Sequence, residues 1–170
     1  QRRGMHARRH IGALDAEDIA RLAALPAARG VTLAPECAAP GLIAQLTAAG
    51  IRVSAGHTEA TAEQMAAAQK AGLAGVTHLF NAMSQFQGRA PGAVGAALAD
   101  GDLWCGIIAD GVHVHEKSIL AAWRAKPDKL YLVTDAMAPV GTSMTEFEMA
   151  GEKITLRDGS CFLADGRLAG

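Results

Sequence analysis

Hydrophobic residues follow two alternating patterns along the chain: helical spacing in some segments and short unbroken apolar runs in others. Helical spacing covers 14–25 and 41–48, an Ala-rich stretch between Thr61 and Gly72, then 93–98 and 116–125. Apolar runs bounded by Gly, Pro or polar residues occupy 31–34, 51–55, 75–78, 103–109 and 129–134. Because strands that alternate with helices are typical of βα units, the pattern predicts a parallel sheet.

Short local signals support these boundaries. Asp15 is an expected N-cap, the run from Thr61 to Gln64 has the form of a capping box, and Gly72 is an expected helix stop. From 146 to 168 the hydrophobic pattern alternates and contains two Asp-Gly pairs, which favours β-hairpins over another crossover helix. With no low-complexity linker in the chain, we predict one domain over 1–170.

Polar residues capable of chemistry follow four of the five predicted strands: His57, His78, His113 and Asp135. In a (β/α)₈ barrel the carboxyl ends of the strands meet at one mouth, so these residues could face a single reacting atom. A complete barrel needs about 200–250 residues, so this 170-residue chain would form only part of one. An open α/β sheet with a ligand at its strand ends is the alternative.

The spacing of His57 and His78 suits two adjacent strand ends and could place both imidazoles on one metal ion. Imidazole and carboxylate ligands hold Zn²⁺ or Fe²⁺ and can leave a coordination position open for water. The alternative for each histidine is a polar side chain with an ordinary hydrogen-bond partner. Spacing alone does not decide between a metal ligand and a structural histidine.

Other polar residues have both a functional and a structural interpretation. Asp135 could transfer protons as a general base, or it could cap a loop. Of the histidines in the 113–115 segment, we expect His113 to face the pocket and His115 to lie on the surface near a helix. Glu36 is expected to be structural. Arg89, in a Gly-flanked loop, could bind an anion or could be a solvated surface residue.

Composition narrows the possible partners. The formal charge of −1, from 16 basic and 17 acidic residues, gives no electrostatic reason to expect binding to nucleic acid or to a membrane surface. Hydrophobic residues make up 50% of the chain, enough for a packed core. Three widely spaced cysteines do not form a disulfide framework, so we expect a reducing, cytoplasmic compartment. The opening residues lead us to expect that the sequence begins within a longer protein.

Five segments together resemble the N-acetylglucosamine-6-phosphate deacetylase family of the amidohydrolase superfamily. They are VSAGHT (53–58), THLFNAM (77–83), GRAPG (88–92), GIIADGVH (106–113) and LVTDAMAP (132–139). They occur in the family's order and with its spacing. The resemblance implies an α/β fold that is part of a (β/α)₈ TIM-type barrel, with a β-hairpin excursion near the C-terminus.

The resemblance also implies an activity and a set of site residues. The reaction would be hydrolysis of the N-acetyl group of N-acetylglucosamine 6-phosphate, with a divalent cation, zinc or iron, held by His57 and His78. Asp135 matches the catalytic aspartate. The matched substrate contacts are Met5, His6, Asn81, Ala82, Arg89, His113, Leu168, Ala169 and Gly170. Arg89 matches the arginine that meets the 6-phosphate, reaching in from a neighbouring subunit, which would explain a homodimer.

One family feature is missing. The carboxylate metal ligand of the family lies in a His-Leu-Glu-Gly-Pro motif upstream of the Gly-x-His segment, and this motif does not occur in the sequence. We do not assign that role to Glu36, and we expect residues 1–170 alone to bind metal weakly and to be inactive. The alternatives are another amidohydrolase, acting on a cyclic amide, and a non-catalytic sugar-phosphate binding module.

Overall fold

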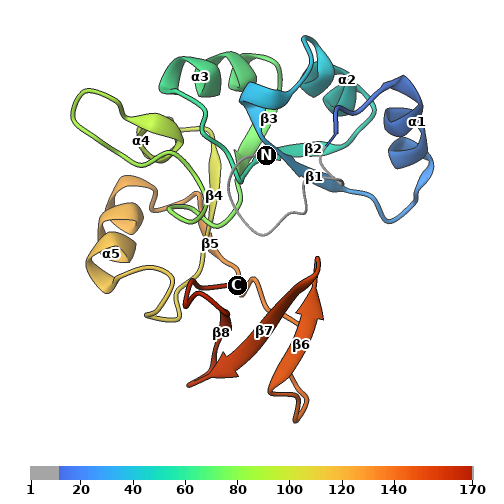
Figure 1. Cartoon of the computed structure of the whole chain (residues 1–170). Helices are drawn as coiled ribbons and strands as arrows, with labels where there is room; N and C mark the ends of the chain where they lie inside the picture. The colour runs from blue at the N-terminus through green and yellow to red at the C-terminus, as the bar shows by residue number, and fades with distance from the viewer. Residues whose placement is uncertain (1–11, 170) are drawn as a thin grey trace.

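The computed structural model describes residues 12–169, which form two β-sheets and a set of helices (Figure 1). The helices are α1 (Ala16–Ala24), α2 (Leu42–Ala48), α3 (Ala62–Lys70), α4 (Gly92–Ala99), α5 (Glu116–Ala125) and the 3₁₀ helix η2 (Pro35–Cys37). The strands of the larger sheet are β1 (Gly30–Leu33), β2 (Arg52–Ala55), β3 (Leu73–Val76), β4 (Trp104–Ile107) and β5 (Leu130–Leu132). The smaller sheet contains β6 (Glu146–Met149), β7 (Glu152–Arg157) and β8 (Ser160–Leu163).

The larger sheet is parallel, and its strand order follows the sequence from β1 to β5. Parallel strands that stay in sequence order need crossovers of one hand, which puts all the connecting helices on the same side of the sheet. Figure 1 shows this arrangement, with helices around the outside of a curved sheet. The prediction of a parallel sheet built from βα units is therefore confirmed.

The predicted helix starts are confirmed by hydrogen bonds. Asp15 and Thr61 each cap a helix as part of a reciprocal capping box, with Asp18 and Gln64 as their partners. Strand boundaries differ more. The strand predicted over 75–78 ends at Val76, so His78 lies two residues beyond it in a bend. The backbone on either side of His78 stays hydrogen-bonded to the neighbouring strands, since the Thr77 N–H donates to the Ala55 carbonyl and the Leu79 N–H donates to the Gly106 carbonyl.

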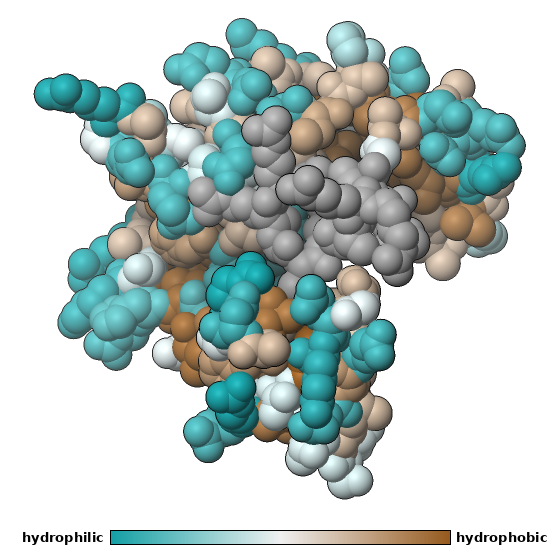
Figure 2. All heavy atoms as spheres, in the orientation of Figure 1, coloured by the Kyte–Doolittle hydropathy of each residue, from teal (hydrophilic) through white to brown (hydrophobic). Residues whose placement is uncertain are grey.

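The main core lies between the larger sheet and its helices. Leu46, Val53, Val76, Leu79 and Ile107 are fully buried there. Figure 2 shows hydrophilic side chains over much of the helical surface and apolar surface beside β5. Leu132 and Val140, on and after β5, are 75% and 69% exposed. Among residues 12–169, no helix is long and apolar enough to cross a membrane.

The smaller sheet is antiparallel, in the order β6, β7, β8, which confirms the hairpins predicted over 146–168. Its own core is small and consists of Ile154, Cys161 and Leu163, packed against partly buried neighbours that include Met137. The contact with Met137 joins the hairpins to the loop that follows β5. This sheet is therefore placed to form a wall beside the carboxyl ends of the parallel strands.

Candidate functional site

A cavity of about 1090 Å³ opens at the carboxyl ends of the parallel strands. Its lining brings together polar residues that are far apart in sequence: His57, His78, Asn81, His113 and Asp135. Residues of β6 and its turn, from 147 to 150, form part of the wall, together with Leu168 and Ala169. The predicted convergence of strand-end residues on one cavity is present in the described part of the chain.

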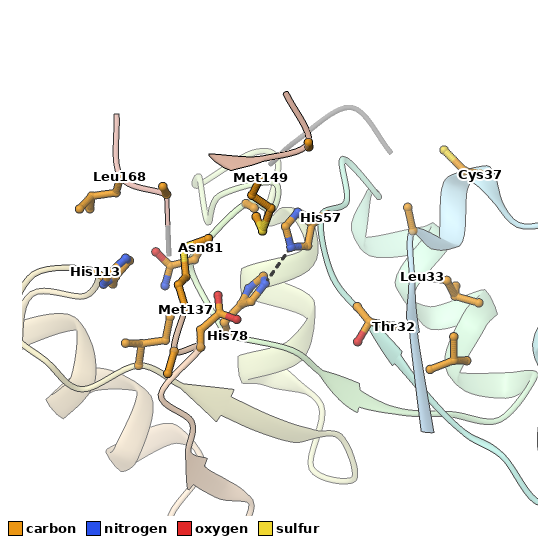
Figure 3. Close-up of a pocket in the computed structure, with 18 of the residues that line it drawn as sticks. Thr32, Leu33, Cys37, His57, His78, Asn81, His113, Met137, Met149 and Leu168 are labelled. Atoms are coloured by element: carbon orange, nitrogen blue, oxygen red, sulfur yellow. Dashed lines mark hydrogen bonds between the residues drawn. The ribbon is translucent and has the colours of Figure 1, made fainter. Parts of the chain in front are cut away.

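His57 and His78 point at each other across this cavity (Figure 3). Their Nε2 atoms lie 3.0 Å apart, and the two rings meet nearly edge to face at 73°. Both residues have positive φ, 49° for His57 and 38° for His78. This backbone conformation costs a non-glycine residue about 1–3 kcal/mol and recurs at functional sites, where surrounding structure holds it.

The two imidazoles fit a shared divalent cation. Two nitrogens bound to one tetrahedral Zn²⁺ at about 2.0–2.1 Å lie about 3.3 Å apart, close to the distance between the two Nε2 atoms. His78 is 3% exposed, and its Nδ1 atom has no hydrogen-bond partner among residues 12–169. Within the same residues, no group of three or more His, Cys, Asp or Glu side chains could hold a metal. Residues 12–169 thus bring together two imidazole nitrogens that fit one cation, without a third ligand side chain beside them.

A hydrogen-bond network fixes the loop that carries His57. The hydroxyl of Thr58, which is fully buried, donates to the Glu36 carboxylate at 2.5 Å, and the Glu59 backbone N–H donates to the same carboxylate at 2.7 Å. The Thr58 backbone N–H donates to the Ala82 carbonyl at 3.0 Å. Glu36, which follows β1, therefore has the structural role predicted for it, because it holds the loop that follows β2. The Thr58 backbone ties the same loop to the segment after β3.

Below the two histidines, a glycine allows the flanking strands to approach each other. A Cβ atom at Gly56 would lie 2.6 Å from Thr32 Cγ2 and 3.2 Å from Thr77 Cβ. Thr32 and Thr77, from either side of β2, hydrogen-bond to each other at 2.8 Å. A glycine inside a strand pattern marks such close approaches. The residue before His57 is thus glycine because the floor of the cavity has no room for a side chain.

Asp135 follows β5, lines the cavity and is exposed. Its φ is 49°, the same positive region as at His57 and His78. Three residues predicted from strand ends therefore share a left-handed backbone where their strand stops. A carboxylate at this position is accessible to a water or a substrate in the cavity.

The β4 end carries a carboxylate and imidazole pair. The Asp110 Oδ2 atom lies 2.6 Å from His113 Nδ1, and Oδ1 accepts the backbone N–H groups of Val112 and His113 at 2.9 Å each. Burial alone would raise the pKa of Asp110. The hydrogen bonds from the His113 backbone, the His113 ring and Val112 outweigh it and lower the pKa from 3.8 to about 2. Asp110 is therefore an ionised acceptor at neutral pH.

Comparison with known proteins gives one consistent class of relative. No protein-family model matches the chain. It is 46% identical over 164 residues to an N-acetylgalactosamine-6-phosphate deacetylase of Shewanella sp. (strain ANA-3), covering 92% of this chain and 42% of the relative. It is 42% identical over 142 residues to the N-acetylglucosamine-6-phosphate deacetylase of Bacillus subtilis, covering 82% of this chain and 36% of the relative.

Solved structures agree with these relatives. The N-acetylglucosamine-6-phosphate deacetylase of Pasteurella multocida superimposes with a TM-score of 0.93 at 37% identity, over 99% of this chain and 45% of that one. The chain is homologous to part of these amino-sugar 6-phosphate deacetylases. The Thermotoga maritima deacetylase gives a TM-score of 0.90 over 98% of this chain. These superpositions confirm the predicted fold class, part of a (β/α)₈ barrel. The chain spans about two fifths of the length of its curated relatives.

The structure places the remaining predicted residues in different surroundings. Asn81, Ala82, Leu168 and Ala169 line the cavity. Arg89 is exposed at the tip of a turn closed by two backbone hydrogen bonds between Gln87 and Ala90, and it is not part of the cavity lining. His115 caps α5 and is exposed, as predicted. Met5, His6 and Gly170 lie outside the described residues.

Two groups near the cavity were not predicted to matter at the site: Asp110, and the pair of Glu36 with Thr58. The sequence around Asp110 could have indicated its role. Asp110-Gly111 is the start of a typical Asx turn, and His113 lies three residues after the aspartate. The contact of Glu36 with Thr58 joins residues 22 positions apart, and no local pattern in the sequence indicates it.

Proposed function

We propose that the protein containing this chain hydrolyses the N-acetyl group of N-acetylglucosamine 6-phosphate, releasing acetate and glucosamine 6-phosphate. The convergence of the His57 and His78 Nε2 atoms, 3.0 Å apart, on a cavity that Asp135 also lines carries this proposal. Identity of 42% to the Bacillus subtilis N-acetylglucosamine-6-phosphate deacetylase supports the choice of reaction. Neither a cyclic-amide hydrolase nor a non-catalytic binding module is favoured by these relatives.

His57 and His78 are proposed to hold a divalent cation, zinc or iron. When bound, such a cation acts as a Lewis acid that polarises the amide carbonyl and lowers the pKa of a coordinated water to about 7. The chain's part is to present two neutral imidazoles from a buried, hydrogen-bonded framework. The family resemblance assigns the third ligand, a carboxylate, to a motif upstream of the Gly-x-His segment.

Asp135 is proposed to move the proton that amide hydrolysis requires. It accepts a proton from water as the water oxygen bonds to the acetyl carbonyl carbon. It then gives this proton to the amide nitrogen as the carbon–nitrogen bond breaks, so that glucosamine leaves as an amine. Its exposure to the cavity supports this role, because a proton-transfer group must reach both the water and the leaving nitrogen.

The sugar is proposed to lie against the strand-end loops. Its contacts would come from Asn81, Ala82, His113, Leu168 and Ala169, which line the cavity, with Met5, His6 and Gly170 as further expected contacts. Arg89 is on an exposed turn outside the cavity lining, which supports a homodimer in which it binds the 6-phosphate in the neighbouring subunit.

The three free cysteines support a cytoplasmic protein.

The test is acetate release by the intact metal-loaded protein. We expect turnover of N-acetylglucosamine 6-phosphate, and binding without acetate release would overturn the proposal. Arg89→Ala should lower kcat/KM for the phosphorylated sugar by about 10–150-fold, the worth of a hydrogen bond to a charged group, and leave the unphosphorylated sugar unchanged. Arg124→Ala, at an exposed position on α5, is the matched control.

A second substrate has specific support. The Shewanella relative, at 46% identity, is an N-acetylgalactosamine-6-phosphate deacetylase. The two sugars differ in the configuration of a single hydroxyl, on C4, which stands along the carbon chain between the acetamido group on C2 and the phosphate on C6. Comparing kcat/KM for the two phosphorylated sugars decides between them. A ratio above one for N-acetylgalactosamine 6-phosphate would replace the first substrate with the second.

A further inference from the structure

The pair formed by Asp110 and His113 extends the site beyond the two cavity histidines. His113 lines the cavity, and Figure 3 shows its ring among the other lining residues. The His113 side chain is 9% exposed. Its Nε2 atom is buried and has no hydrogen-bond partner among residues 12–169. A buried polar atom without a partner is costly, so one at a cavity wall indicates a ligand that supplies the missing hydrogen bond.

The other nitrogen of His113 is already committed. Nδ1 lies 2.6 Å from Asp110 Oδ2. An ionised carboxylate only accepts hydrogen bonds, so the proton between these two atoms must be carried by Nδ1. In the neutral ring this leaves the lone pair on Nε2, directed away from Asp110. The carboxylate therefore selects one of the two tautomers of His113.

Asp110 is itself held in place by the turn that it starts. Its Oδ1 atom accepts two backbone N–H groups, from Val112 and His113, at 2.9 Å each. Gly111, between Asp110 and Val112, has a φ of 78°, which a side chain would disfavour. These hydrogen bonds lie within four consecutive residues. The hydrogen bonds that orient the imidazole thus all lie within residues 110–113.

We propose that Asp110 is a positioning residue: it fixes His113 as the Nδ1–H tautomer and thereby presents Nε2 to a hydroxyl of the sugar phosphate. This inference rests on the proposed function for the identity of the ligand. The tautomer itself follows from the contacts of Asp110. A hydroxyl is the complementary group because it can donate a hydrogen bond to the Nε2 lone pair.

Asp110→Asn tests the proposal in the intact protein. The asparagine Oδ1 atom can still accept both backbone N–H groups, but its NH₂ group would replace Oδ2 and cannot accept from Nδ1. The expected result is a change of the His113 tautomer to Nε2–H, read from ring ¹⁵N chemical shifts of labelled histidine. His113→Asn assigns the signal. Asp102→Asn, an exposed aspartate before the opposite end of β4, is the matched control.

The same variant should lower kcat/KM for the sugar phosphate by about 10–100-fold, as is typical when a group that orients a functional histidine is removed. In a His113→Asn background, Asp110→Asn should add little, because the aspartate acts through the histidine. This cycle also separates positioning from a general loss of folding, which would add to the effect of His113→Asn.

Each outcome decides the proposal. An Nε2–H tautomer in the wild type, or an unchanged tautomer in Asp110→Asn, overturns it. A changed tautomer with unchanged kcat/KM also overturns it, because Nε2 would then not contact the substrate. Failure of the wild-type protein to release acetate counts against the proposed function. In that case the tautomer measurement, which needs no turnover, still decides the role of Asp110.

Discussion

The carboxyl ends of β2 and β4 each present a histidine to the same cavity, but they hold it in different ways. The His57 loop is tied to distant parts of the chain through Glu36 and through the carbonyl of Ala82. His113 is held by Asp110, three residues before it. One histidine depends on tertiary structure, and the other depends on a turn.

This difference matches the task that we propose for each end. A metal ligand must be placed relative to a second ligand on another strand, so the contacts that fix it have to cross between strands. A substrate-contacting histidine needs only the right tautomer and direction, which a local carboxylate supplies. Among residues 12–169, the Asp135 side chain at the β5 end has neither kind of support. Asp135 is exposed and follows a strand at the edge of the sheet formed by residues 12–169.

The largest expected effect is at this third end. Asp135→Asn in the intact protein should lower kcat by about 10²–10⁴-fold, because the amide cannot accept and return a proton. Metal content and the free energy of unfolding should stay the same, since the side chain is exposed. Acetate release and elemental analysis measure the two properties. Asp158→Asn is a matched control, because Asp158 also has a positive φ, 48°, in a hairpin turn.

An Asp135→Asn variant that kept its kcat would remove the proton-transfer role. A variant that lost metal would instead show that Asp135 helps the histidine pair to hold the cation. The β5 end would then not be independent of the β2 end.

A smaller effect is expected at the β2 end. Glu36→Ala removes the acceptor of Thr58 and Glu59, so the His57 loop loses its tie to η2. We expect affinity for a divalent cation to fall by up to about 10–100-fold, the range for losing a group that orients a metal ligand, because Glu36 acts on His57 through the neighbouring Thr58 and Glu59. Competition with a chelating dye measures this affinity, and Glu63→Ala, an exposed change on α3, is the control.

Glu36→Gln sharpens this test, because the amide oxygen can still accept one of the two hydrogen bonds. Its affinity for the cation should lie between those of the wild type and Glu36→Ala. If all three proteins bind the cation equally, the long-range contact does not position His57. The structural difference between the His57 and His113 loops would then have no effect on function.

The sequence predicted the parallel sheet and its strand ends because both depend on local periodicity and on Gly and Pro punctuation. It also predicted that His57, His78 and Asp135 lie at one cavity, since carboxyl ends of parallel strands share an edge. It did not predict the contact between Glu36 and Thr58, which arises only once η2 packs beside β2. The position of His78 beyond its strand was also missed, because pairing to neighbours decides where β3 ends.

The smallest expected effect is on stability at acid pH, and it comes from Asp110 at the β4 end. The pKa of Asp110 is lowered to about 2 in the folded protein, against 3.8 for the free side chain, so the ionised group stabilises the fold above pH 3.8. This contribution is lost as the pH falls from 3.8 toward 2, where the folded protein must also bind the proton. Asparagine does not titrate, so Asp110→Asn lacks this particular loss.

The difference in free energy of unfolding between wild type and Asp110→Asn should therefore shrink between pH 5 and pH 3, about the interval over which the free side chain takes up its proton. Urea unfolding at the two pH values measures it. Asp165→Asn is an informative comparison, because Arg167 contacts lower the Asp165 pKa on a fully exposed turn. Solvent screens that pair, so its pH dependence should be the weaker of the two. Equal pH dependence in both variants would mean that the β4 turn holds Asp110 no more firmly than an exposed hairpin turn holds Asp165.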